Sequence, residues 1–175
     1  MTLLPFLHRV AARVDLPIGE AREAMGVLLE GGATPVEIAA FLVALRMKGE
    51  TASEVAGFAQ AMRAHMVRVD AGADIVDNCG TGGDSSGTFN ISTTAAFVLA
   101  GAGAKVAKHG NRSRTGRGSA EVLQQLGVDV DAGRDVQRRC MDEAGICFCF
   151  AIHHHPATRH VMPVRKALGI PTIFN

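Results

Sequence analysis

The chain has 175 residues, of which 47% are hydrophobic and 20% are charged, which is typical of a soluble globular protein. Its formal net charge of +1 argues against a partner bound mainly through opposite charge, such as nucleic acid or an anionic membrane. No apolar run approaches the length of a transmembrane helix, and we expect the four cysteines to be free thiols of a cytoplasmic protein.

The first seventy residues predict a helical domain. Apolar residues recur at helical spacing in residues 3–14 and 21–29. Residues 34–37 (Thr-Pro-Val-Glu) and 51–54 (Thr-Ala-Ser-Glu) are capping boxes, which predict the starts of a third and a fourth helix. Amphipathic helices joined by short loops favour a compact bundle over residues 1–70.

From residue 71 onward, strand-like runs alternate with helix-like runs. We expect strands at 75–76, 105–107 and 146–152, and helices at 94–99, 119–126, 134–144 and 156–168. This alternation predicts an α/β fold with a parallel sheet, whose loops at one edge form the site. The closing run 171–175 is apolar and β-prone, so we interpret residues 71–175 as the first part of an α/β domain that is truncated here.

The most informative segment is residues 79–93, Cys-Gly-Thr-Gly-Gly-Asp-Ser-Ser-Gly-Thr-Phe-Asn-Ile-Ser-Thr. Its glycines allow backbone N–H groups to approach a ligand closely. Asn90, Ser92 and Thr93 stand at an expected helix start, where the N–H groups and the helix dipole favour an anion. Asp84 fits if a divalent cation or a ribose hydroxyl is also bound. The segment matches neither a P-loop nor a dinucleotide fingerprint, and it predicts a cradle for phosphate or pyrophosphate.

A second polar segment covers residues 108–119, Lys-His-Gly-Asn-Arg-Ser-Arg-Thr-Gly-Arg-Gly-Ser. We expect a loop that an anion would order, with Lys108 as a point charge on phosphate and Arg112 forked onto it. A solvated basic turn is the alternative interpretation.

Histidines cluster at residues 153–155 and at His160. Three consecutive histidines cannot all point one way on a strand, and no cysteine or carboxylate stands at a matching metal spacing. We therefore favour a loop that faces an aromatic substrate over a zinc site. Arg165 could pair with a carboxylate. Neither a nucleophile elbow nor a persuasive acid–base carboxylate pair is found, which favours a mechanism that depends on charge placement and positioning.

Three motifs in order, at 80–84 with 90–93, at 108–112, and at 155–157 with 163–165, resemble the anthranilate phosphoribosyltransferase family. The resemblance covers the whole chain and implies a nucleoside phosphorylase/phosphoribosyltransferase-type fold. It implies transfer of the phosphoribosyl group of 5-phosphoribosyl 1-pyrophosphate to anthranilate in tryptophan biosynthesis, giving N-(5-phosphoribosyl)anthranilate and pyrophosphate, with Mg²⁺ as cofactor. It also implies a homodimer formed through the helical domain, on which helix 156–168 packs. Family members are longer and carry a second magnesium site in their later part, so we expect weak or no turnover from this chain alone.

The resemblance also implies the site residues. The hydroxyl of Ser92 would be a magnesium ligand, and no residue acts as a covalent or acid–base catalyst. Anthranilate would be held by Gly80, Asn111 and Arg165, with His109 and His154 along its channel. The expected residues for 5-phosphoribosyl 1-pyrophosphate are Gly80, Gly83, Asp84, Thr88, Asn90, Ile91, Ser92, Thr93, Lys108, His109, Gly110, Asn111, Arg112, Ser113, Arg114, Thr115, Gly116 and Ser119.

Two other functions stay open at this point. Arg112, Arg114 and Arg117 suit a nucleic-acid-binding relative without catalytic activity, although the balanced net charge argues against it. A pyrimidine nucleoside phosphorylase shares the expected fold, but its lysine-rich phosphate loop differs from residues 108–119.

Overall fold

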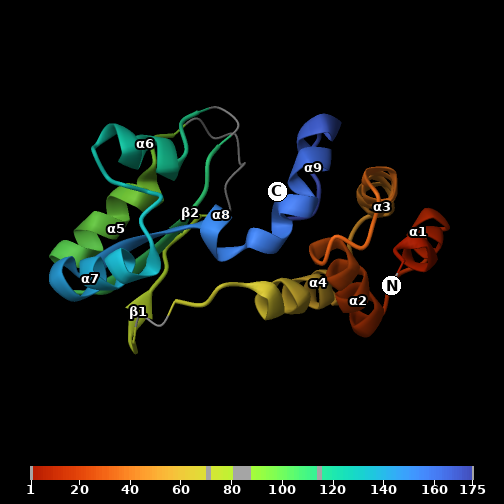
Figure 1. Cartoon of the computed structure of the whole chain (residues 1–175), viewed down its shortest axis with the longest axis horizontal. Helices are drawn as coiled ribbons and strands as arrows, with labels where there is room; N and C mark the ends of the chain where they lie inside the picture. Colours follow the sequence, from red (N-terminus) through yellow and green to blue (C-terminus); the bar gives the residue numbers. More distant parts are fainter. Residues whose placement is uncertain (1, 70–71, 81–87, 114–115, 175) are drawn as a thin grey trace. The chain divides into compact units, whose positions relative to one another are not determined.

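The computed structural model describes residues 2–69, 72–80, 88–113 and 116–174, which fold into two compact units (Figure 1). The helical unit combines Met1–Met66 with His155–Asn175, and the α/β unit is Val67–His154. Within the described part of the chain, none of the helices has both the length and the apolar composition needed to cross a bilayer.

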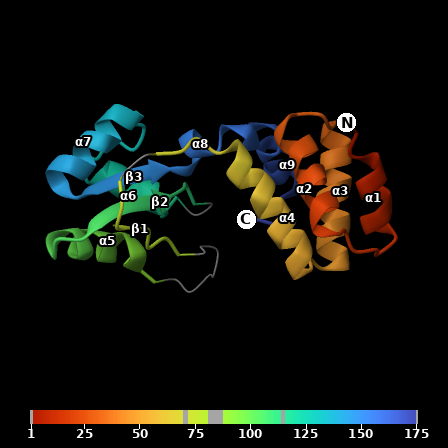
Figure 2. The same ribbon diagram turned by 90° about the horizontal axis from the view of Figure 1, so that it is seen from below.

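Helices form the whole of the first unit (Figure 2). They are α1 (Leu4–Ala11), α2 (Ile18–Leu29), α3 (Pro35–Lys48), α4 (Ala52–His65), the 3₁₀ helix η1 (Pro156–His160) and α9 (Met162–Leu168). Helix α2 packs along α4 and against η1, while α3 packs against α1 and α9. Gly57 permits the closest of these approaches, because a Cβ atom there would lie 2.3 Å from the carbonyl oxygen of Ile18.

The core of the helical unit is continuous and apolar. The rings of Phe41 and Phe58 meet edge to face with centroids 6.3 Å apart, and both side chains are fully buried. Leu28 of α2, Val10 of α1 and Val164 of α9 belong to the same cluster. Burial of each large apolar side chain contributes about 1.5–3 kcal/mol, so this cluster is what holds the short helices together.

Both predicted capping boxes are confirmed. The backbone N–H of Glu37 donates to Thr34 Oγ1 over 3.3 Å, and that of Thr34 donates to Glu37 Oε2 over 2.7 Å. The same exchange joins Thr51 and Glu54, where the N–H of Thr51 donates to Oε2 over 2.8 Å. In α3 and α4 the N–H groups of the N-cap residue and of the third helical residue are therefore satisfied by side chains.

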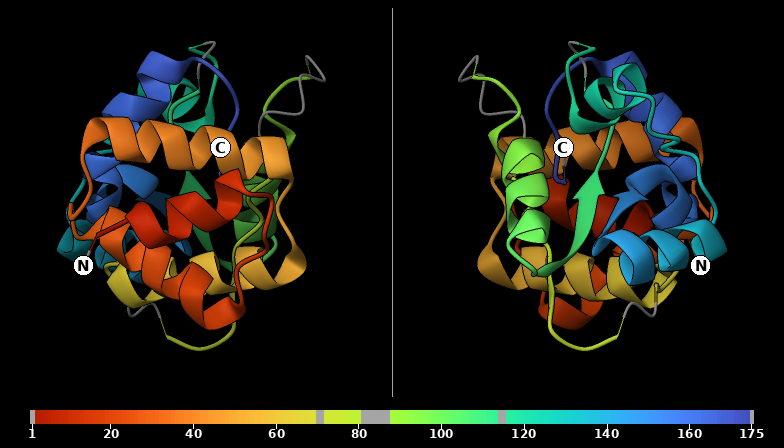
Figure 3. Two further views of the ribbon diagram at one scale, coloured as in Figure 1. Left: turned by 90° about the vertical axis from the view of Figure 1, so that its right-hand side faces the viewer. Right: turned by 90° about the vertical axis from the view of Figure 1, so that its left-hand side faces the viewer.

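The α/β unit is built around a three-stranded parallel sheet in the order β1-β2-β3 (Figure 3). Val106 pairs with Val76 on one side and with Ile146 on the other, so the carboxyl ends of the strands meet at one edge. Phe150 and Leu123 belong to a small core between strand and helix. The elements are β1 (Ile75–Val76), α5 (Ile91–Gly101), β2 (Lys105–Gly110), α6 (Ser119–Gln125), α7 (Arg134–Ala144), β3 (Ile146–Phe150) and α8 (Ala151–His154).

The single helix expected over residues 156–168 is wrong, because the segment is η1 followed by α9. Pro163 explains the break, since proline lacks an N–H group and its ring clashes with the carbonyl four residues earlier in a continuous α-helix. It is tolerated in the first turn of α9.

Two other boundaries differ from the sequence expectation. The strand predicted over 146–152 ends at Phe150, and the next four residues form α8. Strand β2 continues to Gly110, three residues into the segment expected to be a loop, because Lys108–Gly110 pair with Phe148–Phe150 of β3. Tertiary pairing thus extends a strand that local sequence does not mark.

Candidate functional site

The candidate site lies at the carboxyl edge of the parallel sheet. Residues 77–80 follow β1, residues 108–112 end and follow β2, and α8 follows β3. In open α/β sheets this edge is where ligands bind, since the loops after the strands converge there. The two polar segments singled out from the sequence therefore reach the same edge.

The start of α5 faces this edge and is held by hydrogen bonds to the start of α6. Asn90 stands at the N-cap position without capping the helix with its side chain. Its Nδ2 donates to the carbonyl oxygen of Gly118 over 3.3 Å, and Thr93 Oγ1 donates to Ser119 Oγ over 2.9 Å. The N–H groups of the first helical turn have no acceptor within the helix, which makes this start suited to an anion.

Asn78 supports the same helix start and was not foreseen from the sequence. Its Nδ2 donates to the carbonyl oxygen of Ser92 over 2.8 Å. Its Oδ1 is buried and accepts no hydrogen bond from the described residues. The signal that would have found it is its position directly after β1, where a polar side chain enters the carboxyl edge.

Lys108 brings a positive charge to the edge. The residue is only 3% exposed, and its Nζ donates to the carbonyl oxygen of His109 over 3.1 Å. Burial lowers the pKa of Lys108, while the nearby Cys79 and Asp77 act in the opposite direction. Because an ammonium has three donors and the described residues satisfy one, Lys108 has capacity for an anionic ligand.

Asp77 joins β1 to β2 and is a second residue that sequence reasoning missed. Its Oδ1 accepts the backbone N–H of Cys79 over 3.1 Å and that of His109 over 3.3 Å. Burial lowers the pKa of His109, Asp77 raises it in part, and His154 lowers it further.

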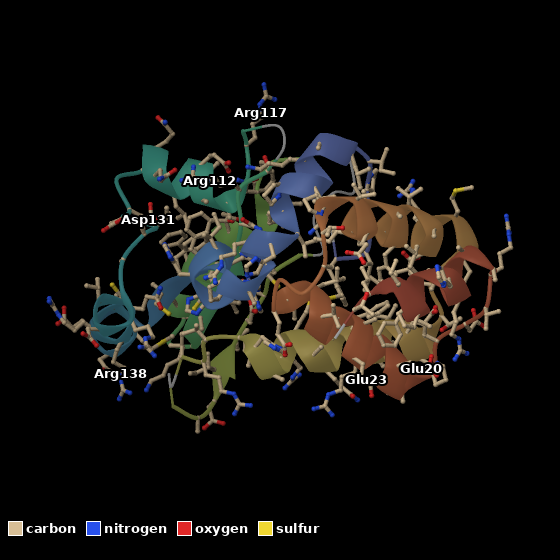
Figure 4. The ribbon with its side chains drawn as sticks, turned by 45° about the vertical axis from the view of Figure 1, so that its right-hand side comes forward. Glu20, Glu23, Arg112, Arg117, Asp131 and Arg138 are labelled. Atoms are coloured by element: carbon tan, nitrogen blue, oxygen red, sulfur yellow. The ribbon has the colours of Figure 1, made fainter. Side chains whose placement is uncertain are left out.

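The segment after β2 is tied to α6 and to the sheet. The N–H of Arg112 donates to Asn111 Oδ1 over 2.8 Å. The Arg112 guanidinium lies 5.4 Å from the centre of the Phe150 ring, and its Nη1 donates to Gln124 Oε1 over 3.3 Å. Figure 4 shows Arg112 beside α6, whereas the side chain of Arg117 points away from the fold. Arg112 is therefore engaged by its own fold, and its fork onto phosphate stays a prediction.

Glycine at position 118 is required by close packing of this segment. A Cβ atom there would lie 2.7 Å from Glu121 Oε2 and 2.8 Å from the backbone nitrogen of Ser113. Glu121 Oε1 accepts the N–H of Ser113 over 3.2 Å, and Ser113 Oγ accepts the N–H of Arg117 over 3.0 Å. Ser113 is thus held by Glu121 of α6 and in turn holds Arg117.

The histidine cluster differs from the loop that the sequence predicted. His153 and His154 lie on α8, and they have different partners. His153 Nε2 lies 2.8 Å from Asp131 Oδ1, while His154 Nδ1 lies 3.2 Å from the carbonyl oxygen of Val67. A zinc site made of the consecutive histidines is not formed by the side chains described.

The remaining predicted residues fall into three groups. Arg165 belongs to the helical unit, where its Nε donates to Thr172 Oγ1 over 3.1 Å and burial lowers its pKa. Four predicted residues lie outside the described residues: Gly83, Asp84, Arg114 and Thr115. The others lie in the α/β unit around its carboxyl edge: Gly80, Thr88, Ile91, Ser92, Gly110 and Gly116.

The two units match two models of one family. Residues 4–66 match the helical bundle domain of the glycosyl transferase family, and residues 72–175 match the a/b domain of the same family. The chain belongs to the glycosyl transferase family.

Within this family, the curated relatives and the solved structures that the chain resembles are anthranilate phosphoribosyltransferases. Anthranilate phosphoribosyltransferase of Rhizobium rhizogenes is 53% identical over 174 residues, which are 99% of this chain and 52% of the relative. That of Rubrobacter xylanophilus is 52% identical over 97% of this chain and 50% of the relative. The chain spans about half the length of the curated relatives it matches.

Two solved structures extend the comparison. Anthranilate phosphoribosyltransferase of Thermus thermophilus has a TM-score of 0.86 at 43% identity, over 96% of this chain and 52% of its own. The Saccharomyces cerevisiae enzyme in complex with PRPP and Mg has a TM-score of 0.86 at 31% identity, over 98% of this chain and 52% of its own. The family resemblance and fold class predicted from the sequence motifs are thus confirmed.

Proposed function

We propose that this chain carries the 5-phosphoribosyl 1-pyrophosphate site of an anthranilate phosphoribosyltransferase, a cytoplasmic enzyme of tryptophan biosynthesis. The observation that carries the proposal is the meeting of the α5 start and the buried Lys108 at one sheet edge. Both groups favour an anion, and both belong to the motifs that resemble the anthranilate phosphoribosyltransferase family. The reaction replaces the bond between the anomeric carbon and pyrophosphate with a bond to the anthranilate nitrogen.

The residues act by placing charge and by positioning. Negative charge develops on the pyrophosphate as it leaves, and the Lys108 ammonium with the first N–H groups of α5 would stabilise it. Hydrogen bonds from Asn90 to Gly118 and from Thr93 to Ser119 would keep the two helix starts at a fixed separation. Pre-organised donors of this kind avoid reorganisation during the reaction.

Mg²⁺ fits the oxygen groups at the start of α5. The Ser92 hydroxyl has no partner among the described residues, so its oxygen is available as a ligand. Mg²⁺ is commonly held by few protein oxygens together with substrate phosphates and water. When bound, it would neutralise part of the pyrophosphate charge, with Ser92 as the ligand proposed from this part of the chain.

Anthranilate would be recognised by groups that suit an aromatic carboxylate. We assign Gly80 and Asn111 to its binding, with His109 and His154 along the channel, and Arg165 to its carboxylate. A guanidinium can hold a carboxylate through two parallel hydrogen bonds, and partial burial strengthens such a pair. Loss of anthranilate binding with intact donor binding in Arg165→Ala would support the last assignment.

The helical unit would form the dimer that the family resemblance implies. An open apolar groove of about 910 Å³ is lined by α1, α3 and α9. Val36 and Met47 in its lining are 78% and 68% exposed. Large exposed apolar surface of this kind favours a protein partner, and we propose that a second copy of this chain binds the groove. Light scattering should give a dimer that Met47→Glu dissociates, and a monomeric wild type would overturn this part of the proposal.

Donor binding tests the proposal directly. Calorimetric titration of the chain with 5-phosphoribosyl 1-pyrophosphate should give saturable binding that strengthens with Mg²⁺. Absence of binding in both conditions would refute the assignment. Turnover is followed separately by the loss of anthranilate fluorescence, and we expect it to be weak or absent for these 175 residues alone because the relatives are about twice as long. Robust turnover would show that this expectation is wrong.

A further inference from the structure

Asp77, Cys79 and His109 form a cluster of metal-ligating side chains beside the proposed donor site. Each offers one ligand atom, and the three atoms all lie within 4.8 Å of one another. Cys79 follows β1 and His109 lies on β2, so sheet pairing rather than sequence proximity brings them together. The proposed chemistry of phosphoribosyl transfer uses neither Asp77 nor the Cys79 thiol.

The Asp77 carboxylate is already oriented for this arrangement. Its Oδ1 accepts the backbone N–H groups of both Cys79 and His109, the two residues whose side chains complete the cluster. The same carboxylate oxygen therefore fixes the backbone on either side of the cluster. Hydrogen bonds that orient ligating groups are a regular feature of metal centres in proteins.

We propose that Asp77, Cys79 and His109 bind a thiophilic divalent cation of the Zn²⁺ class, with one coordination position left for solvent or an anion. Sulfur, imidazole nitrogen and carboxylate oxygen are the ligand types that Zn²⁺ takes at about 2.0–2.3 Å. Tetrahedral coordination at those lengths places the ligand atoms about 3.5 Å apart. Asp77 and Cys79 are exposed residues, so rotation about their side-chain bonds can shorten the distances between the ligand atoms from within 4.8 Å to this value.

The ligand set distinguishes this site from the magnesium site proposed at Ser92. Mg²⁺ prefers oxygen ligands and octahedral geometry, whereas a thiolate and an imidazole select later transition metals. Metal binding requires the Cys79 thiolate and releases its proton to the solvent. Burial raises the pKa of Cys79 and the Asp77 charge raises it further, whereas the nearby Lys108 charge lowers it. The negative charge of Asp77 attracts a cation, and the positive charge of Lys108 favours the thiolate.

Cobalt titration of the metal-free chain tests the proposal without any substrate. We expect one equivalent of Co²⁺ to give a sulfur-to-cobalt charge-transfer band that Zn²⁺ removes and excess Mg²⁺ does not. Cys79→Ala should abolish the band. Asp77→Asn keeps an oxygen for the two backbone bonds but loses the charge. It should weaken Co²⁺ binding by at least about tenfold, since even outer partners of a metal site cost 10–100-fold.

Two other thiols provide matched controls. Cys140 is an exposed thiol on α7, and Cys149 lies on β3, opposite His109 in the sheet register. Cys140→Ala and Cys149→Ala should retain the band, with circular dichroism confirming that every variant is folded. A wild type without the band, or a band that persists in Cys79→Ala, would overturn the proposal. Loss of the band in Cys149→Ala would also overturn this ligand set. Because no phosphoribosyl donor is present, these outcomes are independent of the proposed function.

Discussion

Two lysines with buried side chains, Lys48 in the helical unit and Lys108 in the α/β unit, show how differently the units treat a charge. The Lys48 Nζ lies 2.9 Å from Glu54 Oε2 and 2.7 Å from Asp15 Oδ1, and the side chain is 4% exposed. Burial acts to lower the pKa of Lys48, but its carboxylate partners raise it above the ordinary value. Burial prevails at Lys108 and lowers its pKa. A lysine held in ion pairs that outweigh its burial stabilises the fold, whereas a lysine whose burial prevails is suited to a ligand.

The starts of α4 and α5 show the same contrast. Thr51 and Glu54 close the start of α4, whereas Asn90 at the start of α5 turns its side chain to Gly118. Each helix carries a serine at its second position, Ser53 in α4 and Ser92 in α5. The start of α4 is thus capped by its own side chains, whereas the start of α5 is not and is suited to an anion.

Removal of the carboxylate at Glu54 should have the largest effect. Glu54 is 0% exposed and also accepts the N–H of Leu16 over 3.0 Å. Glu54→Ala leaves the Lys48 ammonium buried without this partner and should cost about 3–5 kcal/mol of unfolding free energy. Urea denaturation measures it, and Glu37→Ala in the exposed capping box of α3 is the control with a smaller loss. Equal losses in the two variants would show that burial of the Lys48 pair is unimportant.

The next effect separates binding from stability at Lys108. Lys108→Met removes a charged donor and should weaken binding of 5-phosphoribosyl 1-pyrophosphate by roughly 10–100-fold, since hydrogen bonds to charged groups contribute about 1.5–3 kcal/mol. Its unfolding free energy should stay equal or rise, because an apolar side chain replaces a buried ammonium. Lys105→Met, at the exposed start of the same strand, is the matched control. Unchanged donor affinity in Lys108→Met would remove Lys108 from the proposed site.

A smaller effect is expected at Ser92, for which Ser53 at the equivalent position of α4 is the control. Ser92→Ala should raise the Mg²⁺ concentration needed for half-maximal donor binding by about fivefold, which corresponds to one lost ligand interaction of about 1 kcal/mol. Ser53→Ala occupies the equivalent position of α4 and should leave this concentration unchanged. Calorimetry at several Mg²⁺ concentrations measures both. The same response in the two variants would contradict the role of Ser92.

The smallest effect concerns acid stability. Burial acts to raise the pKa of Glu54, but hydrogen bonds from Lys48, Thr51 and Leu16 hold it below the ordinary value of 4.5. Its contribution to stability is therefore complete above about pH 4.5 and is lost as pH falls through the folded-state pKa. Thermal unfolding of Glu54→Gln should depend less steeply on pH in that range than unfolding of the wild type. Parallel pH profiles would refute this linkage.

Features whose residues lie close together in the sequence could be predicted from the sequence alone. The capping boxes at Thr34 and Thr51 were predictable because cap and partner stand three residues apart. The family resemblance was also predictable, since its motifs are contiguous runs such as residues 108–112. The residues of these motifs were therefore known before the structure, whereas Asp77 and Asn78 were not.

Only the tertiary structure decided which residues far apart in the sequence contact one another. Strand β2 extends to Gly110 because β3, some forty residues later, supplies the partner carbonyl and N–H groups. Asp77 accepts a hydrogen bond from the N–H of His109, and the Arg112 guanidinium lies over the Phe150 ring. These contacts depend on which strands become neighbours, and local propensity carries no information about that choice. The sequence by itself thus determined which donors and acceptors the site contains, while the parallel sheet decided which of them are satisfied within the fold and which stay available to a ligand.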